Sequence, residues 1–228
     1  MAMSVDDLLS EFARRAETIK RPVDAVVGFY ELSDGSLYNS AAYIQFDPTP
    51  TLVGVYRKFF LPSYGVFDEE RFVSRGSELG VFQTRFGKVG VLICEDVWHS
   101  VLPMLCAVSG AQILLVPSAS PGRGFSGEMI GNLERYDRML RAVSEEHGVF
   151  AMNCQLCGFE GGKGFVGGSS IVNPMGEVLA RSPISEPHLL SASIDLDVIG
   201  IARAQTPLIS DLRSAWSDLQ GMVAAIKG

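Results

Sequence analysis

The stretch Lys88-Val-Gly-Val-Leu-Ile-Cys94-Glu95-Asp96-Val-Trp98 decides the fold assignment of this chain. Its apolar run, residues 89–93, has the length of a strand buried on both faces, as in the parallel sheets of α/β proteins. The run stops at a cysteine followed by two acids, which belong at a polar rim rather than in a core. Because ligands of α/β proteins bind at the carboxyl ends of strands, this position predicts a functional thiol.

Composition narrows the class of protein. The chain has 228 residues, 47% of them hydrophobic, which suits one globular domain spanning residues 1–228. Nineteen basic and 26 acidic residues give a net charge of −7 without any basic block, so we expect no nucleic acid and no membrane surface as a partner. The N-terminus lacks the apolar core of a signal peptide. The four cysteines do not form a disulfide framework, so we expect a cytoplasmic location.

Hydrophobic periodicity predicts an α/β fold with many strands and a few long helices. Ser4 caps the first predicted helix, and Gly148 ends the longest one. Residues 57–76 and 158–168 are expected to be loops, the first long and polar-aromatic and the second rich in glycine. The predicted helices are residues 4–20, 101–109, 128–147 and 211–226, and the predicted strands are 24–30, 38–46, 52–58, 81–84, 88–94, 111–116, 149–153, 169–173, 178–181 and 189–194.

A cysteine nucleophile needs a nearby cation that favours its thiolate. The chain has three histidines, His99, His147 and His188, and none stands in a pattern that marks it as the partner of Cys94. Lys58 is the other candidate, because it ends an apolar strand among aromatic residues and is expected to be buried. From the residues alone, a structural ion pair is the more common explanation of a lone buried lysine.

A set of motifs spread over nearly the whole chain resembles the carbon–nitrogen hydrolase (nitrilase) superfamily. The lysine motif comes first and the cysteine motif follows it, in the order and at the spacing of that superfamily. The matching segments are residues 37–41, Tyr56-Arg57-Lys58 with Leu61-Pro62, residues 67–72 with Gly76, residues 90–98, Pro117–Pro121, Asn153, residues 158–161, 165–169, 173–177 and 195–197, and the series Arg203, Pro207, Asp211 and Arg213.

The resemblance implies an α-β-β-α sandwich that carries a Glu-Lys-Cys triad. Cys94 is then the nucleophile, which attacks an amide or nitrile carbon and forms a thioester that water hydrolyses. Lys58 stabilises the thiolate and the oxyanion, and the backbone N–H of Glu95 is the second oxyanion donor. Glu69 matches the auxiliary glutamate that orients the lysine, although a solvated acid in the run of residues 68–70 is the alternative explanation.

The chain departs from the superfamily at its beginning. The general-base glutamate of the family ends a strand before the first long helices, whereas this chain opens on the helix at residues 4–20, which matches the second helix. Glu31 is the only early acid at a strand end, and its strand aligns with a later one, so the base role is not carried over to it. We therefore expect the chain to lack the first strand, the first helix and the triad base. Three accounts stay open: a truncated or misassigned start, an inactive member, or substitution of the base by Glu95 or Glu69.

The cysteine and lysine motifs are most similar to those in the glutamine amidohydrolase domain of glutamine-dependent NAD synthetases. That resemblance implies substrate contacts by Tyr64, Phe67 and Glu95, and we also expect Trp98 of the cysteine motif and Ser120 of the separate match at residues 117–121 to bind the substrate. Ordinary loop packing is the alternative for the aromatic residues. Arg123 is either a carboxylate-binding residue or a solvated charge. The segment after residue 121 departs from the synthetase pattern, which favours a free-standing amidase with an open substrate.

The remaining signals are weak. Cys154 and Cys157 form a lone C-x-x-C without further ligands, and the glycine-rich segment lacks the context of a nucleotide site, so we expect no metal and no cofactor. The resemblance implies a homo-oligomer formed through the helix after the cysteine and the C-terminal segment. Two classes compete with the amidase: a non-catalytic homologue that binds a ligand or assembles with partners, and a histidine-assisted cysteine hydrolase.

Overall fold

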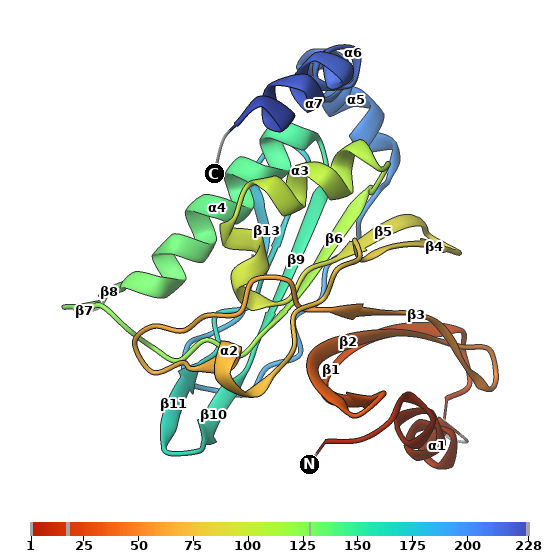
Figure 1. Ribbon diagram of the computed structural model, residues 1–228, viewed down its shortest axis with the longest axis vertical. Helices are drawn as coiled ribbons and strands as arrows, with labels where there is room; N and C mark the ends of the chain where they lie inside the picture. The colour runs from red at the N-terminus through yellow and green to blue at the C-terminus, as the bar shows by residue number, and fades with distance from the viewer. Residues whose placement is uncertain (1, 17–18, 128, 227–228) are drawn as a thin grey trace.

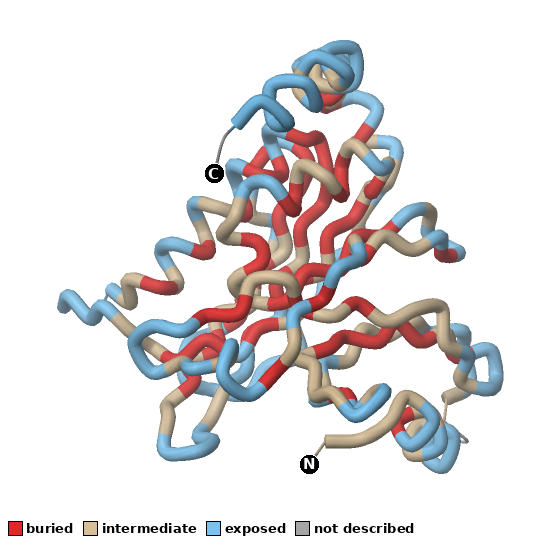
Figure 2. The backbone as a smooth tube through the Cα atoms, in the orientation of Figure 1, coloured by how far each residue is buried: buried red, intermediate tan, exposed pale blue. Residues whose placement is uncertain are grey.

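The computed structural model describes residues 2–16, 19–127 and 129–226, and it has an α/β fold with four layers. Two sheets face each other, and helices cover the outer side of each sheet (Figure 1). Buried residues concentrate along the central strands, whereas the C-terminal helices are largely exposed (Figure 2). The core therefore lies between the two sheets and under the helices that cover the larger sheet.

The larger sheet has six strands in the order β13-β12-β9-β6-β5-β4. Its central strands β5, β6 and β9 run parallel, so their carboxyl ends lie at the same edge, and the segments that follow them meet there. The outer pairs are antiparallel. The bounds are β4 Val81–Thr84, β5 Gly87–Val91, β6 Ile113–Ser118, β9 Phe150–Gln155, β12 Ser170–Val172 and β13 Val178–Arg181.

The smaller sheet is an antiparallel meander of β1 (Val23–Ser33), β2 (Ser36–Phe46) and β3 (Pro50–Arg57). Its first turn joins two predicted strands and has left-handed backbone at Asp34 and Gly35. Side chains alternate along β2: Ala41 and Tyr43 join the main core, whereas Ala42 and Ile44 pack toward helix α1. This period of two places one face of β2 against the larger sheet and the other against a helix.

Three helices cover the sheets. Helix α1 (Val5–Ala16) covers the smaller sheet, and Ser4 caps it as predicted, because its hydroxyl accepts the Asp7 N–H at 3.1 Å. Helices α3 (Val101–Val108) and α4 (Gly131–His147) cover the larger sheet, and α4 ends at Gly148 with φ +56°, as expected. Residues 17, 18 and 128 of the predicted helices lie outside the described residues. The C-terminal helices are α5 Asp197–Gln205, α6 Leu208–Ser214 and α7 Trp216–Ala225.

Several sequence expectations are wrong in detail. The strand expected at residues 88–94 ends at Val91, because the Ile93 N–H donates to the Asp96 carboxylate instead of continuing a ladder. The expected loop at residues 158–168 contains the hairpin of β10 (Cys157–Glu160) and β11 (Lys163–Val166). The long loop at residues 57–76 contains the short helix α2 (Glu69–Phe72), and β7 (Phe125–Ser126) and β8 (Met129–Ile130) form a small extra hairpin.

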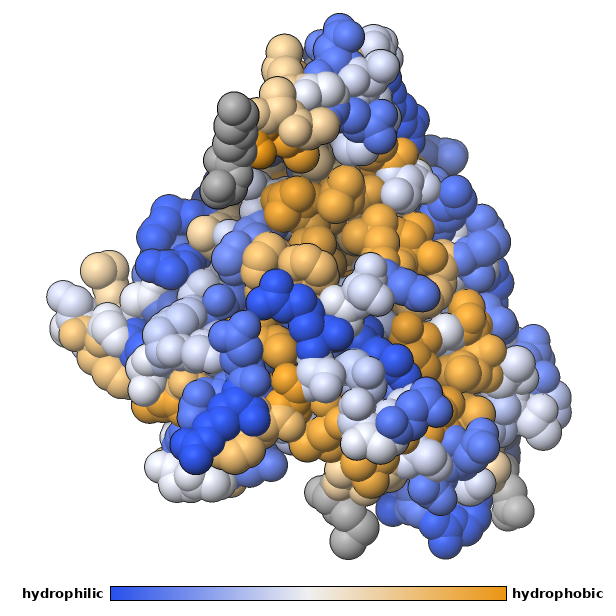
Figure 3. All heavy atoms as spheres, in the orientation of Figure 1, coloured by the Kyte–Doolittle hydropathy of each residue, from blue (hydrophilic) through white to orange (hydrophobic). Residues whose placement is uncertain are grey.

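The C-terminal third differs most from expectation. Residues 189–194 form no strand, and Leu189 is 91% exposed, because no described strand lies beside this segment. The single helix expected at residues 211–226 is broken at Ala215 into α6 and α7, and α5 was not expected at all. None of the helices in the described part of the chain combines the length and apolar character that crossing a bilayer requires. Figure 3 shows apolar side chains gathered over α3 on one face of the molecule.

Candidate active site

Cys94 opens a tight turn just beyond the end of β5. It is the first residue of the 3-10 helix η1 (Cys94–Trp98) and has φ +52°, a left-handed conformation that costs energy in any residue but glycine. The side chain is half-buried. Such strain is characteristic of functional positions, where the surrounding structure holds a side chain in one orientation.

Asp96 holds this turn against the segment that follows β3. The carboxylate accepts the Phe60 N–H at 2.8 Å, the Tyr56 hydroxyl at 2.8 Å and the Ile93 N–H at 3.1 Å. The side chain is fully buried, and burial raises the pKa of Asp96 to about 6 against the effect of these hydrogen bonds. One carboxylate therefore links the cysteine turn to the segment that carries Lys58.

Lys58 and Glu69 form a buried ion pair. Lys58 follows β3 and is 1% exposed, and its Nζ lies 2.7 Å from Glu69 Oε2. Glu69 is the first residue of α2, and its other oxygen accepts the side-chain amide of Asn39 at 3.4 Å. The Lys58 backbone is fixed on both sides, by Asn39 O and by the N–H of Gly76. The approach at Gly76 is so close that a Cβ there would lie 2.1 Å from the carbonyl oxygen of Arg57.

Opposing effects act on the Cys94 thiol. Burial raises its pKa, and the charge of Glu69 acts in the same direction. The charge of Lys58, a contact of 3.2 Å between Sγ and the Tyr136 hydroxyl, and the backbone N–H of Ala119 act in the opposite direction. The structure thus brings Cys94, Lys58 and Glu69 into one electrostatic cluster, as the sequence predicts.

The remaining predicted residues surround this cluster. The Tyr64 hydroxyl donates to Glu95 Oε2 at 2.6 Å, and burial together with that carboxylate raises the pKa of Tyr64 to about 12. The guanidinium of Arg123 lies over three rings, 5.3 Å from Phe67 and 5.9 Å from each of Tyr64 and Trp98. No carboxylate of the described residues lies within ion-pair range of Arg123.

Ser120 is buried within the loop that follows β6. Its hydroxyl accepts the side-chain amide of Asn132 at 3.1 Å, and Asn132 also binds Pro121 O and the Arg123 N–H. These hydrogen bonds fix the course of the loop. They leave the Ser120 hydroxyl engaged with the protein rather than exposed at the surface.

Glu31 belongs to a different cluster. Its carboxylate pairs with Arg57 at 2.7 Å and accepts the Ser40 hydroxyl at 2.6 Å. The hydrogen bond from Arg57 lowers the pKa of Glu31 despite burial. The charges of Glu69 and Lys58 act on the pKa of its neighbour Tyr30. Successive residues of a strand point to opposite faces of the sheet. Glu31 therefore lies across the sheet from Lys58.

No histidine is among the described groups that act on the Cys94 thiol. His99 stacks on Phe60 with ring centroids 3.6 Å apart, and its Nε2 lies 3.6 Å from Glu95 Oε1. Burial lowers the pKa of His147, which ends α4. No described hydrogen bond joins a histidine to Cys94.

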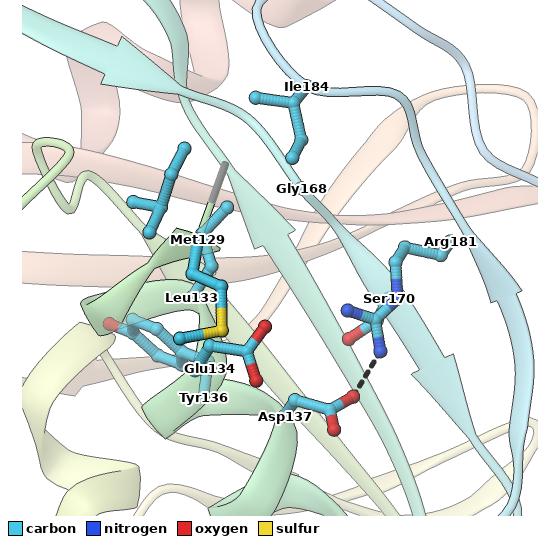
Figure 4. A pocket seen from close by; sticks show the side chains of 10 residues that line it. Met129, Leu133, Glu134, Tyr136, Asp137, Gly168, Ser170, Arg181 and Ile184 are labelled. Atoms are coloured by element: carbon cyan, nitrogen blue, oxygen red, sulfur yellow. Dashed lines mark hydrogen bonds and ion pairs between the residues drawn. The ribbon is translucent and has the colours of Figure 1, made fainter. Parts of the chain in front are cut away.

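Tyr136 is the residue at the sulfur that the sequence did not single out. It lies on the buried face of α4, where its position in the apolar stripe resembles that of any packing residue. Its ring lines a hollow of about 150 Å³ that also contains the Asp137–Arg181 ion pair (Figure 4). The available signal was its hydroxyl among the buried residues of α4, since a buried hydroxyl requires a partner.

Comparison with known proteins identifies the family. Residues 9–204 match the family model of the carbon–nitrogen hydrolases. The glutamine-dependent NAD(+) synthetase of Thermotoga maritima is 33% identical over 83% of this chain, which spans 31% of that protein. A carbon–nitrogen hydrolase from Helicobacter pylori G27 superimposes with a TM-score of 0.82 at 26% identity, covering 94% of this chain and 76% of that one.

A mutant of the amidase from Nesterenkonia sp. AN1, which carries the product of acrylamide addition at its active-site cysteine, has a TM-score of 0.67 at 25% identity. It covers 88% of this chain and 74% of that one. The family match extends over most of the chain, and the fold agrees with solved members. The chain belongs to the carbon–nitrogen hydrolase family.

Proposed function

We propose that this chain is an amidase that cleaves a carbon–nitrogen bond through a thioester on Cys94. The observation that carries the proposal is the cluster in which Lys58, paired with Glu69, acts on the pKa of a thiol held in a strained turn. The family membership and the cysteine adduct of the Nesterenkonia amidase support it.

The reaction has two steps. Cys94 Sγ attacks the carbonyl carbon while the thiol proton passes to a base, and the C–N bond breaks as the leaving nitrogen takes up a proton. Water then attacks the thioester, releases the carboxylic acid and restores the thiol. Lys58 and the backbone N–H of Glu95 stabilise the oxyanion in both steps. Glu69 is the carboxylate whose charge acts on Cys94, and we assign proton transfer in this chain to it.

The surroundings of Arg123 favour a substrate that carries a carboxylate of its own. The guanidinium lies over three rings, and no described acid pairs with it. A carboxylate is the natural ligand of an arginine fork that no acid neutralises. Glutamine combines a side-chain amide with a carboxylate, and the synthetase relative is glutamine-dependent. We therefore propose a glutamine-type amide as the substrate.

A substrate panel tests this function. Ammonia release is measured with glutamine, a neutral amide of similar length and a neutral nitrile, with Cys94→Ala as the blank. We expect glutamine to be the best of the three. Arg123→Gln is expected to lower kcat/KM for glutamine about tenfold or more and to leave the neutral amide unaffected, because only the carboxylate loses a charged partner.

Absence of ammonia from every compound would favour the alternative, a non-catalytic homologue that binds a ligand or assembles with partners. A neutral amide preferred over glutamine, with no effect of Arg123→Gln, would keep the amidase and reject the glutamine-type substrate.

A further inference from the structure

A chain of buried polar side chains connects the end of β9 to the nucleophile. Tyr136 is 3% exposed, and its hydroxyl lies 3.2 Å from Cys94 Sγ. The side chains of Ser118 and Gln155 also hydrogen-bond this hydroxyl. Asn153 joins these two residues, because it contacts both Ser118 and Gln155. The direction of each hydrogen bond in this series decides whether the Tyr136 hydroxyl donates a hydrogen to the sulfur or accepts one from it.

Asn153 fixes the direction at one end. Its Nδ2 lies 2.8 Å from the carbonyl oxygen of Val116, and a carbonyl only accepts. The second Nδ2 hydrogen is then directed at Ser118 Oγ, 2.9 Å away. The Oδ1 of Asn153 accepts from Gln155 Nε2 at 2.8 Å, which agrees with this orientation. Both hydrogens and the oxygen of the Asn153 amide are therefore assigned by their partners.

Ser118 donates its hydroxyl hydrogen to Tyr136. Its oxygen accepts from Asn153, so its own hydrogen must find another acceptor. The Val116 carbonyl lies 3.4 Å from Ser118 Oγ, longer than an ordinary O–H···O hydrogen bond, so we assign the Ser118 hydrogen to the oxygen of Tyr136. The interactions of Ser118 and Gln155 act to lower the pKa of Tyr136, as donors to its oxygen do, although burial raises that pKa overall. With its oxygen accepting, the Tyr136 hydrogen points to Cys94.

We propose that Tyr136 is a catalytic residue that donates a hydrogen bond to the Cys94 thiolate, and that Ser118, Asn153 and Gln155 are positioning residues that orient this donor. The proposal rests on the proposed role of Cys94 as nucleophile. Burial opposes formation of the thiolate, so a hydrogen bond to the charged form has a large effect there.

The other groups near the sulfur come from different elements. Lys58 after β3 and Glu69 of α2 act on its charge. Glu95 and Asp96 follow Cys94 in η1, where each is bound to a tyrosine, Tyr64 and Tyr56 respectively. None of these groups is altered by removing the Tyr136 hydroxyl. The ring of Tyr136 also packs edge-on against Trp98 at 5.2 Å, which a phenylalanine would preserve.

The test is the pH dependence of alkylation at Cys94. Iodoacetamide is reacted with the full chain over a pH range around the ordinary thiol pKa of about 8.5, and the rate is read by mass spectrometry on the Cys94 peptide. In Tyr136→Phe the midpoint is expected to rise by about one pKa unit or more, so that the rate below the midpoint falls about tenfold. A purely structural role would change the plateau rate and not the midpoint.

Two further variants complete the experiment. Tyr43→Phe is the matched control, because it removes another buried tyrosine hydroxyl, bound to Asp24 at 2.8 Å, and is expected to leave the midpoint unchanged. Ser118→Ala keeps the Tyr136 hydroxyl but removes its orienting donor, so a smaller rise is expected. If Tyr136→Phe does not fold, as judged by far-UV circular dichroism, Ser118→Ala carries the test.

A folded Tyr136→Phe variant with the midpoint of the unaltered chain would overturn the proposal, and so would an unchanged midpoint in Ser118→Ala if that variant carries the test. The measurement needs no turnover. A shifted midpoint without any amide hydrolysis would therefore keep this inference and reject the proposed function. Amide hydrolysis by the unaltered chain, with an unshifted midpoint in the variant, would keep the proposed function and reject this inference.

Discussion

At the scale of single residues, the site depends on a lysine that is almost fully excluded from water. Burial of Lys58 is tolerated because Glu69 provides a carboxylate at 2.7 Å, and the pair in turn acts on Cys94. Removing one partner of such a pair leaves the other charge buried and uncompensated. The three residues are therefore expected to respond to substitution as a unit rather than additively.

Substitution of Lys58 by methionine tests the cation. We expect kcat to fall about 10²–10³-fold or more, since an oxyanion donor and the charge that favours the thiolate are both lost. Ammonia release is the readout. Lys88→Met is the control, because that exposed lysine binds the Ser109 carbonyl and no other group among the described residues. Activity retained in Lys58→Met would contradict this mechanism and favour a histidine-assisted cysteine hydrolase.

The residue roles differ in how far the sequence revealed them. The resemblance to the carbon–nitrogen hydrolases implied that Lys58, Glu69 and Cys94 meet, and in the structure Lys58 pairs with Glu69 and both charges act on Cys94. Tyr136 could not be found in this way, because its position on α4 follows the apolar period and its contact with Cys94 depends on how α4 crosses the sheet. Contacts between distant elements require packing that no local pattern contains.

At the scale of elements, Asp96 joins the turn η1 to the segment after β3. Its folded pKa of about 6 is raised above the ordinary value of 3.8, so the native state binds the proton more tightly than the unfolded chain does. The resulting stabilisation is fully present below 3.8 and is lost as the pH rises through about 6. A shift of this size corresponds to roughly 3 kcal/mol.

Asp96→Asn removes this titration. We expect the free energy of unfolding, measured by urea denaturation, to vary less between these two pH values in the variant than in the unaltered chain. The variant is also expected to be less stable throughout, because asparagine has one accepting oxygen where Asp96 uses two, one for the Phe60 N–H and the other for the Ile93 N–H and the Tyr56 hydroxyl. Parallel pH profiles for the two proteins would contradict the assigned pKa.

Local patterns predicted most elements, and the failures have physical causes. The helix end at Gly148 depends on neighbouring residues alone, and it was predicted. Residues 189–194 alternate like a strand but have no described partner, and a strand exists only through its neighbour. The glycines at 161 and 162 form the turn of the β10–β11 hairpin instead of a loop, which the glycine content alone did not distinguish.

At the scale of the whole molecule, apolar surface lies beside α3 and the C-terminal helices. Val101, Leu208, Met222 and Val223 are large apolar residues exposed to solvent, and Figure 3 shows the apolar area over α3. A surface of this kind marks an interface in many soluble proteins. We therefore expect the interface of the predicted homo-oligomer, through α3 and the C-terminal segment, to lie on this surface.

Replacing Met222 and Val223 by glutamate tests this assembly. Each side chain is about two-thirds exposed in the single chain, so the changes are expected to leave the fold intact. We expect a multiple of the chain mass by light scattering for the unaltered protein and the mass of one chain for the double variant. Leu189→Glu, at an exposed residue outside this surface, serves as the control. A monomeric unaltered protein would contradict the prediction.

The account as a whole depends on covalent chemistry at Cys94, and trapping the acyl-enzyme tests this most directly. The full chain is mixed with glutamine, quenched in acid, digested and analysed by mass spectrometry. The account predicts a glutamyl thioester on the Cys94 peptide that is absent from Cys94→Ala and from the peptides of Cys106, Cys154 and Cys157. No adduct at Cys94 under conditions in which iodoacetamide alkylates that same thiol would contradict it.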